Sequence, residues 1–369
     1  MNKIFLKIVL LIALVFSLHT GTMAQMLDDT TTYELIKSGV DYIYNFQFEN
    51  AKKIYTRLKQ LYPEHPLPFL FRGLITFWEN YPLLADSPYR KSFEDDMNTT
   101  IRLCGEQSTP EHEAEFLMTN LAARGMLLLF YADNSISGEV IPLATGSFKY
   151  VKRAFDFKET YRDFYFVTGL YSYYREAYPQ AHPIYRTIAF LFPGGDKEQG
   201  LIELNLAARY AIFLKAESYS FLSGIYISFE NDFLKASSFS EDLHNLYPEN
   251  PLYIAIYIKN LLLIKEYDRA EEMIVQTRKG RQNDYLKVQL AILNGILYEK
   301  KYHNLRAAKT YYKSGIEKAL KYSDYANEYV AYAYFGLSRI SEAENDHQAA
   351  RNYRRLALDN TAYDNVNFD

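Results

Sequence analysis

The densest group of side chains suited to holding a ligand lies between residues 171 and 178. It includes Tyr173, Tyr174 and Arg175, flanked by Tyr171 and Tyr178. Tyrosine rings beside an arginine can stack on sugar rings or grip a peptide. Aromatic core packing accounts for at least half of these rings, because helical spacing buries some faces in any case. The pattern predicts a candidate binding site at Tyr173, Tyr174 and Arg175 and leaves burial open as the alternative.

Two short segments resemble parts of enzymatic sites, but each lacks a required residue. His112-Glu113 begins like a zinc-protease helix, yet Phe116 stands where the second histidine belongs. Residues 192–197 superficially resemble a phosphate-binding loop, but they lack the second-glycine spacing and the Ser or Thr after Lys197. We expect this segment to begin a helix with Asp196 as its N-cap.

The other residues that could do chemistry are isolated from one another. Cys104 has no catalytic signature around it, and the acidic runs at 94–96 and 111–113 fit helix surfaces or helix starts. The histidines at 65, 112, 182, 244, 303 and 347 show no metal-ligand spacing. We therefore predict no catalytic residue, no metal site and no cofactor. An enzyme is the least favoured hypothesis, because it would need a constellation assembled across distant parts of the chain.

The N-terminus is typical of a secretory signal peptide. Lys3 and Lys7 precede an apolar run over residues 8–18, and small residues follow up to Ala24. The apolar run is too short to span a bilayer, and the single cysteine lies too far away for lipid attachment. We expect a signal peptide over 1–24 and a soluble mature chain from Gln25, located in the periplasm or secreted, without an integral membrane span.

Charge and cysteine content exclude some partners and some sources of stability. Removing the leader takes away two lysines and no acid, which moves the net charge from −4 to −6. This acidic balance, without a long basic run, argues against nucleic acid as a partner. One cysteine cannot form an intrachain disulfide, so packing must stabilise the fold, and 35 tyrosines and 24 phenylalanines supply large faces for it.

A repeated spacing is the most informative feature of the sequence. Gly39, Ala51 and Pro63 lie twelve residues apart, and Gly224, Ala236 and Pro248 repeat these intervals. Both segments close with the phrase Leu-Tyr-Pro-Glu-X-Pro, at 61–66 and at 246–251. Small residues let two helices approach each other closely, and proline ends the second helix. The spacing therefore predicts helical hairpins.

These units resemble tetratricopeptide repeats. The first unit has Gly39, Tyr42, Ala51, Tyr55 and Pro63 at the family's spacing, and a later unit has Gly295, Tyr298, Ala307 and Tyr311 without the closing proline. The segment 169–201 is also loosely similar to repeat proteins of the eukaryotic inclusion-body clearance type. The resemblance implies an all-α fold, a right-handed superhelical solenoid of stacked helix-turn-helix hairpins.

The repeats are expected to form one domain over residues 25–369. Clear units are expected at 32–65, 217–250, 251–284, 288–321 and 329–359, and divergent ones over 66–210 with an insertion at 176–198. Within the divergent part, Gly73, Ala85 and Tyr89 keep the spacing of a unit, and residues 135–146 indicate an inter-helix loop. After residue 359 we expect only a polar tail.

The family geometry implies a concave face lined by the first helix of each hairpin. It places there Tyr33, Ile36, Val40, Ile43, Phe221, Ile225 and Lys259. Such a face could form a groove for a peptide with hydrophobic anchors. Alternatively, the superhelix is tightly wound or the insertion covers the groove, and these side chains are core. We predict an exported, non-enzymatic scaffold that binds a protein or peptide partner. The alternative is a carbohydrate-binding protein that uses exposed tyrosines.

Overall fold

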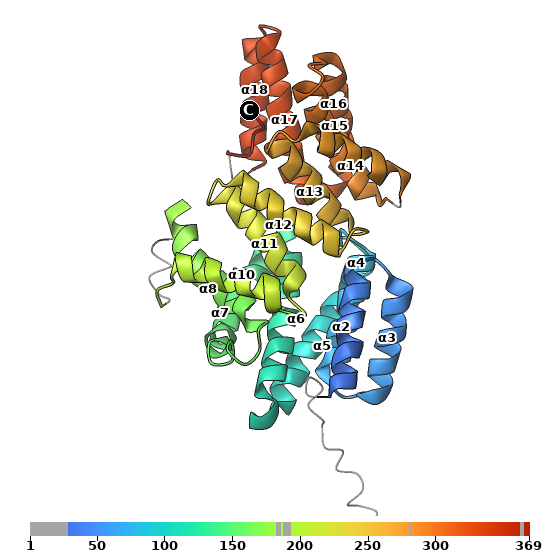
Figure 1. Cartoon of the computed structure of the whole chain (residues 1–369), viewed down its shortest axis with the longest axis vertical. Helices are drawn as coiled ribbons and strands as arrows, with labels where there is room; N and C mark the ends of the chain where they lie inside the picture. Colours follow the sequence, from blue (N-terminus) through green and yellow to red (C-terminus); the bar gives the residue numbers. More distant parts are fainter. Residues whose placement is uncertain (1–28, 182–185, 187–192, 281, 362–364) are drawn as a thin grey trace, which may run out of the picture.

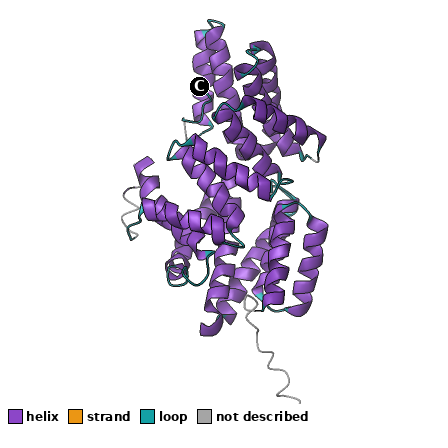
Figure 2. Cartoon of the chain, viewed as in Figure 1, coloured by secondary structure: helices purple, strands orange, loops and turns teal. Residues whose placement is uncertain are grey.

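The computed structural model describes residues 29–181, 186, 193–280, 282–361 and 365–369. The predicted signal peptide at 1–24 lies outside these residues, as does part of the predicted insertion. The described residues form helices and loops with no strand among them (Figure 2). Sequential helices pack on one another along the chain (Figure 1). The predicted fold class, an all-α helical repeat solenoid, is confirmed.

The described helices form eight hairpins joined in series. Their bounds, with each pair in chain order, are α2 Thr30–Tyr44 and α3 Phe48–Leu61, α4 Pro66–Glu79 and α5 Arg90–Gln107, α6 Glu113–Asp133 and α7 Ser137–Ala154, α8 Phe164–Ala181 and α10 Lys197–Tyr210, α11 Lys215–Ser228 and α12 Phe233–Leu246, α13 Pro251–Leu263 and α14 Tyr267–Lys279, α15 Asp284–Lys300 and α16 Leu305–Ala319, and α17 Asn327–Ala343 and α18 His347–Asp359. Two 3-10 helices, η1 Pro110–His112 and η3 Leu320–Ala326, precede α6 and α17.

Six of these hairpins share one turn geometry. The residue two positions before the second helix has a positive φ in each, and these residues are Phe46, Ser135, Asn231, Lys265, His303 and Asn345. In the tightest turns the amide of the following residue donates a hydrogen bond to the carbonyl oxygen five residues earlier. Glu266 N, for example, donates to Leu261 O at 2.9 Å. This left-handed residue satisfies carbonyls at the end of the first helix and reverses the chain. The turn therefore repeats although its sequence does not.

The repeated Leu-Tyr-Pro-Glu-X-Pro phrase ends one helix and starts the next. After α3 the side chain of His65 accepts a hydrogen bond from Leu67 N at 3.2 Å, and Pro66 opens α4. After α12 the side chain of Asn250 accepts from Leu252 N at 3.0 Å, and Pro251 opens α13. Proline suits the first helical position, where no amide donor is needed. The phrase thus encodes the connection between two hairpins.

The divergent part of the chain differs from the sequence expectation at two places. Ala85 and Tyr89 do not lie in a helix but in the long connection 80–89, because α5 begins only at Arg90. Residues 137–146 are not an inter-helix loop, because α7 already begins at Ser137 and contains Pro142. Proline has no N–H to donate to the carbonyl four residues earlier, but α7 continues beyond Pro142 to Ala154.

The C-terminal tail is not merely polar. Val366 is 4 % exposed and Phe368 is 7 % exposed, and the ring of Phe368 lies 5.1 Å from that of Tyr332 in α17. Asn365 Nδ2 donates to Ile227 O in α11 at 2.8 Å. The tail therefore connects the last hairpin to the α11–α12 hairpin, which the sequence alone did not indicate.

The N-terminal hairpins contact the middle of the chain across the superhelix. Asn250 Nδ2 donates to Tyr44 O at 3.1 Å, and the rings of Tyr44 and Tyr253 lie 6.3 Å apart. Asn283 Nδ2 donates to Tyr81 O at 3.0 Å. The middle of the solenoid therefore packs against its first two hairpins. In Figure 1, α4 lies next to the region of α12 and α13. As a result, much of the inner face of the first helices is core.

Candidate functional site

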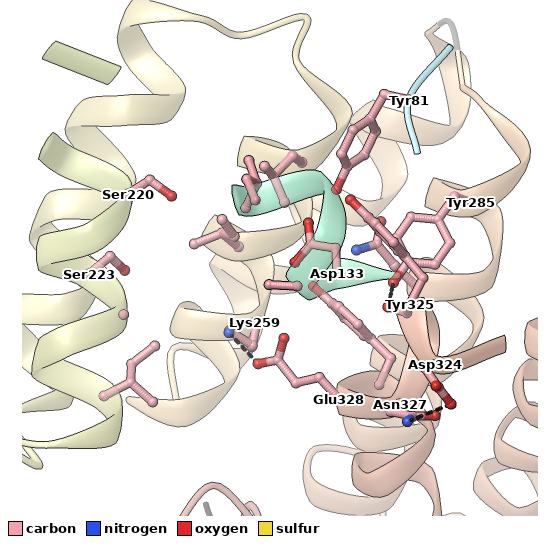
Figure 3. Close-up of a pocket in the computed structure, with 18 of the residues that line it drawn as sticks. Tyr81, Asp133, Ser220, Ser223, Lys259, Tyr285, Asp324, Tyr325, Asn327 and Glu328 are labelled. Carbon is pink, nitrogen blue, oxygen red and sulfur yellow. Dashed lines mark hydrogen bonds and ion pairs between the residues drawn. The ribbon is translucent and has the colours of Figure 1, made fainter. Parts of the chain in front are cut away.

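A cavity of about 540 Å³ remains where this inner face is not filled. Most of its wall comes from the first helices of six hairpins, α4, α6, α11, α13, α15 and α17, together with the turn before α5 and η3. Figure 3 shows Ser220 and Ser223 of α11 on one side, Tyr81, Tyr285 and Tyr325 on the other, and Asp133 between them. Exposed lining residues, among them Ala132, Ser135 and Asp324, mark its mouth.

One wall of the cavity is a cluster of tyrosines. The ring of Tyr81 lies 6.3 Å from that of Tyr285 and 6.1 Å from that of Tyr325, and Tyr285 and Tyr325 are 5.4 Å apart, all edge-on. Tyr285 Oη also donates to the backbone oxygen of Tyr325 at 3.0 Å. Trp78 stacks on Tyr81 at 5.4 Å. These contacts hold the rings in place in the wall of the cavity.

Asp133 is the least compensated charge in this wall. It is the last residue of α6, where the negative end of the helix dipole disfavours a carboxylate. Among the described residues no donor hydrogen-bonds to it and no cation pairs with it. Burial raises its pKa to about 7, because the surrounding protein replaces water that would solvate the charged form. A carboxyl group in this position does not stabilise the fold, which makes it a candidate functional residue.

Lys259 faces the same cavity and is already neutralised. Its Nζ lies 2.9 Å from Glu328 Oε1, and Tyr332 Oη also donates to Glu328. Desolvation acts to raise the pKa of Glu328, but the lysine and the tyrosine outweigh it and lower that pKa. The Glu328 side chain is 52 % exposed because it borders the cavity. The described residues that line the cavity therefore provide no unpaired positive charge.

Two further features of the wall suit a ligand. Gln289 is 1 % exposed, and its Oε1 atom has no hydrogen-bond partner among the described residues. A buried acceptor without a partner is costly. On α11, a Cβ atom added to Gly224 would meet no atom within 4 Å, so this side of the cavity is open space.

Of the groove residues predicted from sequence, Lys259 lines this cavity. Ile36, Val40, Ile43 and Ile225 are buried in the core, at 7 % exposure or less. Tyr33 instead lines a smaller cavity of about 230 Å³. Phe221 lies at the surface with its ring 5.5 Å from that of Phe166. The tight winding of the superhelix, left open as an alternative, accounts for the burial.

The predicted tyrosine site is a packed cluster in the structure. Tyr173 is fully buried, and its hydroxyl donates to Glu230. Tyr174 is half-buried, with its ring 5.5 Å from that of Phe229. Arg175 Nη1 lies 3.5 Å from Glu176 Oε1 and forms an ion pair with it. Asp196 caps α10 as expected, accepting from Gln199 N at 2.9 Å.

The smaller cavity contains a buried carboxylate with a structural role. Asp163 accepts hydrogen bonds from the backbone amides of Ile212, Phe213 and Leu214 at 2.7–3.2 Å. Burial raises the pKa of Asp163, while these amides act in the opposite direction. The carboxylate thus orders the connection that leads into α11, and its hydrogen-bonding capacity is used within the protein.

Sequence reasoning missed Asp133 and the tyrosine wall. One signal was available, because Tyr285 and Gln289 continue the helical face of Ile292 and Ile296 towards the start of α15. No sequence signal placed Tyr81 beside Tyr285, since a long stretch of chain separates them.

Comparisons with known proteins do not supply a family. No family model matches the sequence, and the search of curated proteins found no match. Over the part of the chain that the structure describes, His, Cys, Asp and Glu nowhere gather in a group of three or more suited to a metal ion. Within the same residues, no helix combines the length and apolarity needed to cross a membrane.

Proposed function

We propose that this chain is a non-enzymatic binding scaffold, with tetratricopeptide-like repeats, that receives part of a partner protein in its central cavity. The leader-like N-terminus favours a partner in the cell envelope or outside the cell. The cavity is the surface on which the partner docks, and a side chain or chain end enters it.

The convergence of first helices from six hairpins on one cavity supports this proposal. A space of about 540 Å³ falls within the range of ligand sites, and it is large enough for one or two side chains. The wall combines aromatic rings with a few polar groups, as binding sites do. Stacked helical repeats commonly present their inner face to a ligand.

A carbohydrate is the second candidate ligand, and the aromatic wall of the cavity favours it. Tyrosine and tryptophan rings pack against sugar rings, and the hydroxyls offer hydrogen bonds. Tyr173 cannot serve this role in the observed structure because it is fully buried. A sugar would therefore use the central cavity.

Asp133 is the one observation that favours an enzyme, since a carboxyl with a pKa of about 7 could transfer protons. The described residues that line the cavity include neither histidine nor cysteine, and Glu328 is engaged by Lys259. Acid–base catalysis would need a second group to act with Asp133, whereas ligand binding needs none. We therefore retain binding as the proposed function.

Filling the cavity tests the proposed function. Gly224→Phe places a ring in open space, and Gly125→Phe is a matched control on the exposed side of α6, where an added Cβ also meets nothing within 4 Å. Affinity capture from native envelope and secreted proteins should recover the same specific protein with the wild type and Gly125→Phe. Gly224→Phe should lose it. Capture of sugars alone, of nothing, or of the same protein by Gly224→Phe would contradict the proposal.

A further inference from the structure

We propose that the central cavity recognises an organic cation, an ammonium or guanidinium group, which pairs with Asp133 beside the rings of Tyr81, Tyr285 and Tyr325. The inference rests on the proposed function, in which that cation is a lysine or arginine side chain of the partner. A free small amine carries the same chemistry.

The charge balance of the cavity selects a cation. Its charged lining residues are Asp133, Asp324, Glu328 and Lys259. Lys259 is paired with Glu328 at 2.9 Å, so Asp133 and Asp324 have no lysine or arginine partner among the described residues. An anionic ligand would meet repulsion there, whereas a cation would neutralise part of the excess.

The position of Asp133 shows where the cation would sit. The carboxyl group lies deeper than the exposed Asp324, and no described side chain donates to it. It terminates α6, so the helix dipole adds negative potential at the same point. A bound ammonium or guanidinium would supply the missing donors and the missing charge.

The aromatic wall can add to the attraction of a cation to Asp133. Tyr81, Tyr285 and Tyr325 lie within 6.3 Å of one another, which brings three electron-rich rings to the same wall. Cations are attracted to the faces of such rings. Gln289 Oε1, a buried acceptor with no partner in the described part of the chain, can accept one more hydrogen bond from an ammonium group.

Binding should depend on pH through Asp133. The other ionisable groups that line the cavity are Tyr81 before α5, Lys259 of α13, Tyr285 of α15, Asp324 and Tyr325 of η3, and Glu328 and Tyr329 of α17. The described lining residues of α4 and α11 are not ionisable. Burial raises the pKa values of Tyr81, Tyr285, Tyr325 and Tyr329, so these tyrosines stay neutral near pH 7. Cation affinity should therefore rise as Asp133 ionises around pH 7.

Titration calorimetry in an amine-free buffer tests the inference. The probes are acetyl-Gly-Gly-Lys-Gly-Gly-amide, its norleucine counterpart and n-butylammonium. The lysine peptide should bind about tenfold or more tightly than the norleucine peptide. Asp133→Asn should remove this preference, while Asp359→Asn, an exposed aspartate that also ends a helix, should keep it. Butylammonium binding as tight as that of the lysine peptide would assign the site to a free amine.

Equal affinity for the lysine and norleucine peptides would overturn the inference. So would an unchanged lysine preference in Asp133→Asn, or no binding of any cationic probe. The two proposals can fail separately. If Gly224→Phe loses the partner protein but Asp133→Asn keeps it at full affinity, the partner docks without a cation. If the cations bind but no partner protein is captured, the binding site stands and the scaffold function does not.

Discussion

At the scale of single residues, the structure separates side chains that stabilise the fold from one that does not. Glu299 is 7 % exposed and pairs with Arg339 while accepting from Tyr312 Oη at 2.7 Å, so its charge is compensated. Asp133 has neither a donor nor a cation among the described residues. The difference gives Asp133 a measurable cost in folding free energy.

That cost should vary with pH. The pKa of Asp133 is about 7 in the folded protein and about 3.9 in an unfolded chain. Because the folded pKa is the higher one, the penalty is absent below pH ~4, grows between pH ~4 and ~7, and is complete above. Asp133→Asn should therefore raise the free energy of unfolding by up to about 4 kcal/mol at pH ~8 and leave it nearly unchanged at pH ~4. Urea unfolding at both pH values measures this, and a pH-independent difference would contradict it.

Two glycines on first helices should respond oppositely to alanine. A Cβ on Gly336 would lie 2.3 Å from the buried ring of Tyr312, whereas a Cβ on Gly224 meets nothing within 4 Å. Gly336→Ala should lower the free energy of unfolding by about 1–3 kcal/mol through overpacking. Gly224→Ala should raise it by about 0.5–1 kcal/mol, because alanine favours the helix. Chemical denaturation of both variants decides the point, and a loss at Gly224 would mean that its surroundings are filled.

At the scale of elements, the hairpins depend on a turn that forces one residue into a left-handed conformation. Only glycine adopts this conformation without strain, yet none of the six turn residues is glycine. Asparagine, which tolerates it better than most residues, occupies two of them, Asn231 and Asn345. The turns therefore carry some backbone strain that packing between the helices offsets.

Relieving this strain should stabilise a hairpin. Lys265, an exposed residue with φ 64°, joins α13 to α14. Lys265→Gly should raise the thermal midpoint and add about 0.5–1 kcal/mol to the free energy of unfolding. Lys265→Ala keeps the strain and should match the wild type, and Asn345→Gly should gain less. Equal effects of glycine and alanine at 265 would show that the side chain, not the backbone, matters there.

At the scale of the whole molecule, the solenoid is closed by contacts between distant parts of the sequence. Asn250 is fully buried, caps α13 and donates to Tyr44 O of α2. Tyr247 and Tyr253 also contact Tyr44. Ile36, Val40 and Ile43 are buried in this closed arrangement, and the central cavity stays open on the inner face.

Breaking one closing contact should loosen the N-terminal hairpin. Asn250→Asp keeps an N-cap acceptor but loses the donor to Tyr44 O, so it should cost about 1–3 kcal/mol. Hydrogen exchange should increase in α2 and α3 before the rest of the chain. Asn304→Asp is the control, because Asn304 caps α16 in an exposed position. Uniform exchange across the chain in Asn250→Asp would instead indicate a single cooperative unit.

The sequence by itself determined the local structure. Helix spacing, the small residues and the Pro-Glu-X-Pro phrase act over a few residues, so they indicated the two hairpins that end with this phrase. The same local reasoning identified Asp196 as a cap. Only the tertiary structure decided which faces are buried. Gly39 and Gly224 hold the same repeat position, yet an added Cβ would clash with Phe71 at 2.3 Å at the first and meet open space at the second. The winding of the superhelix determines which of the two glycines is packed against a neighbour. This winding depends on contacts between residues far apart in sequence, such as Tyr44 and Asn250.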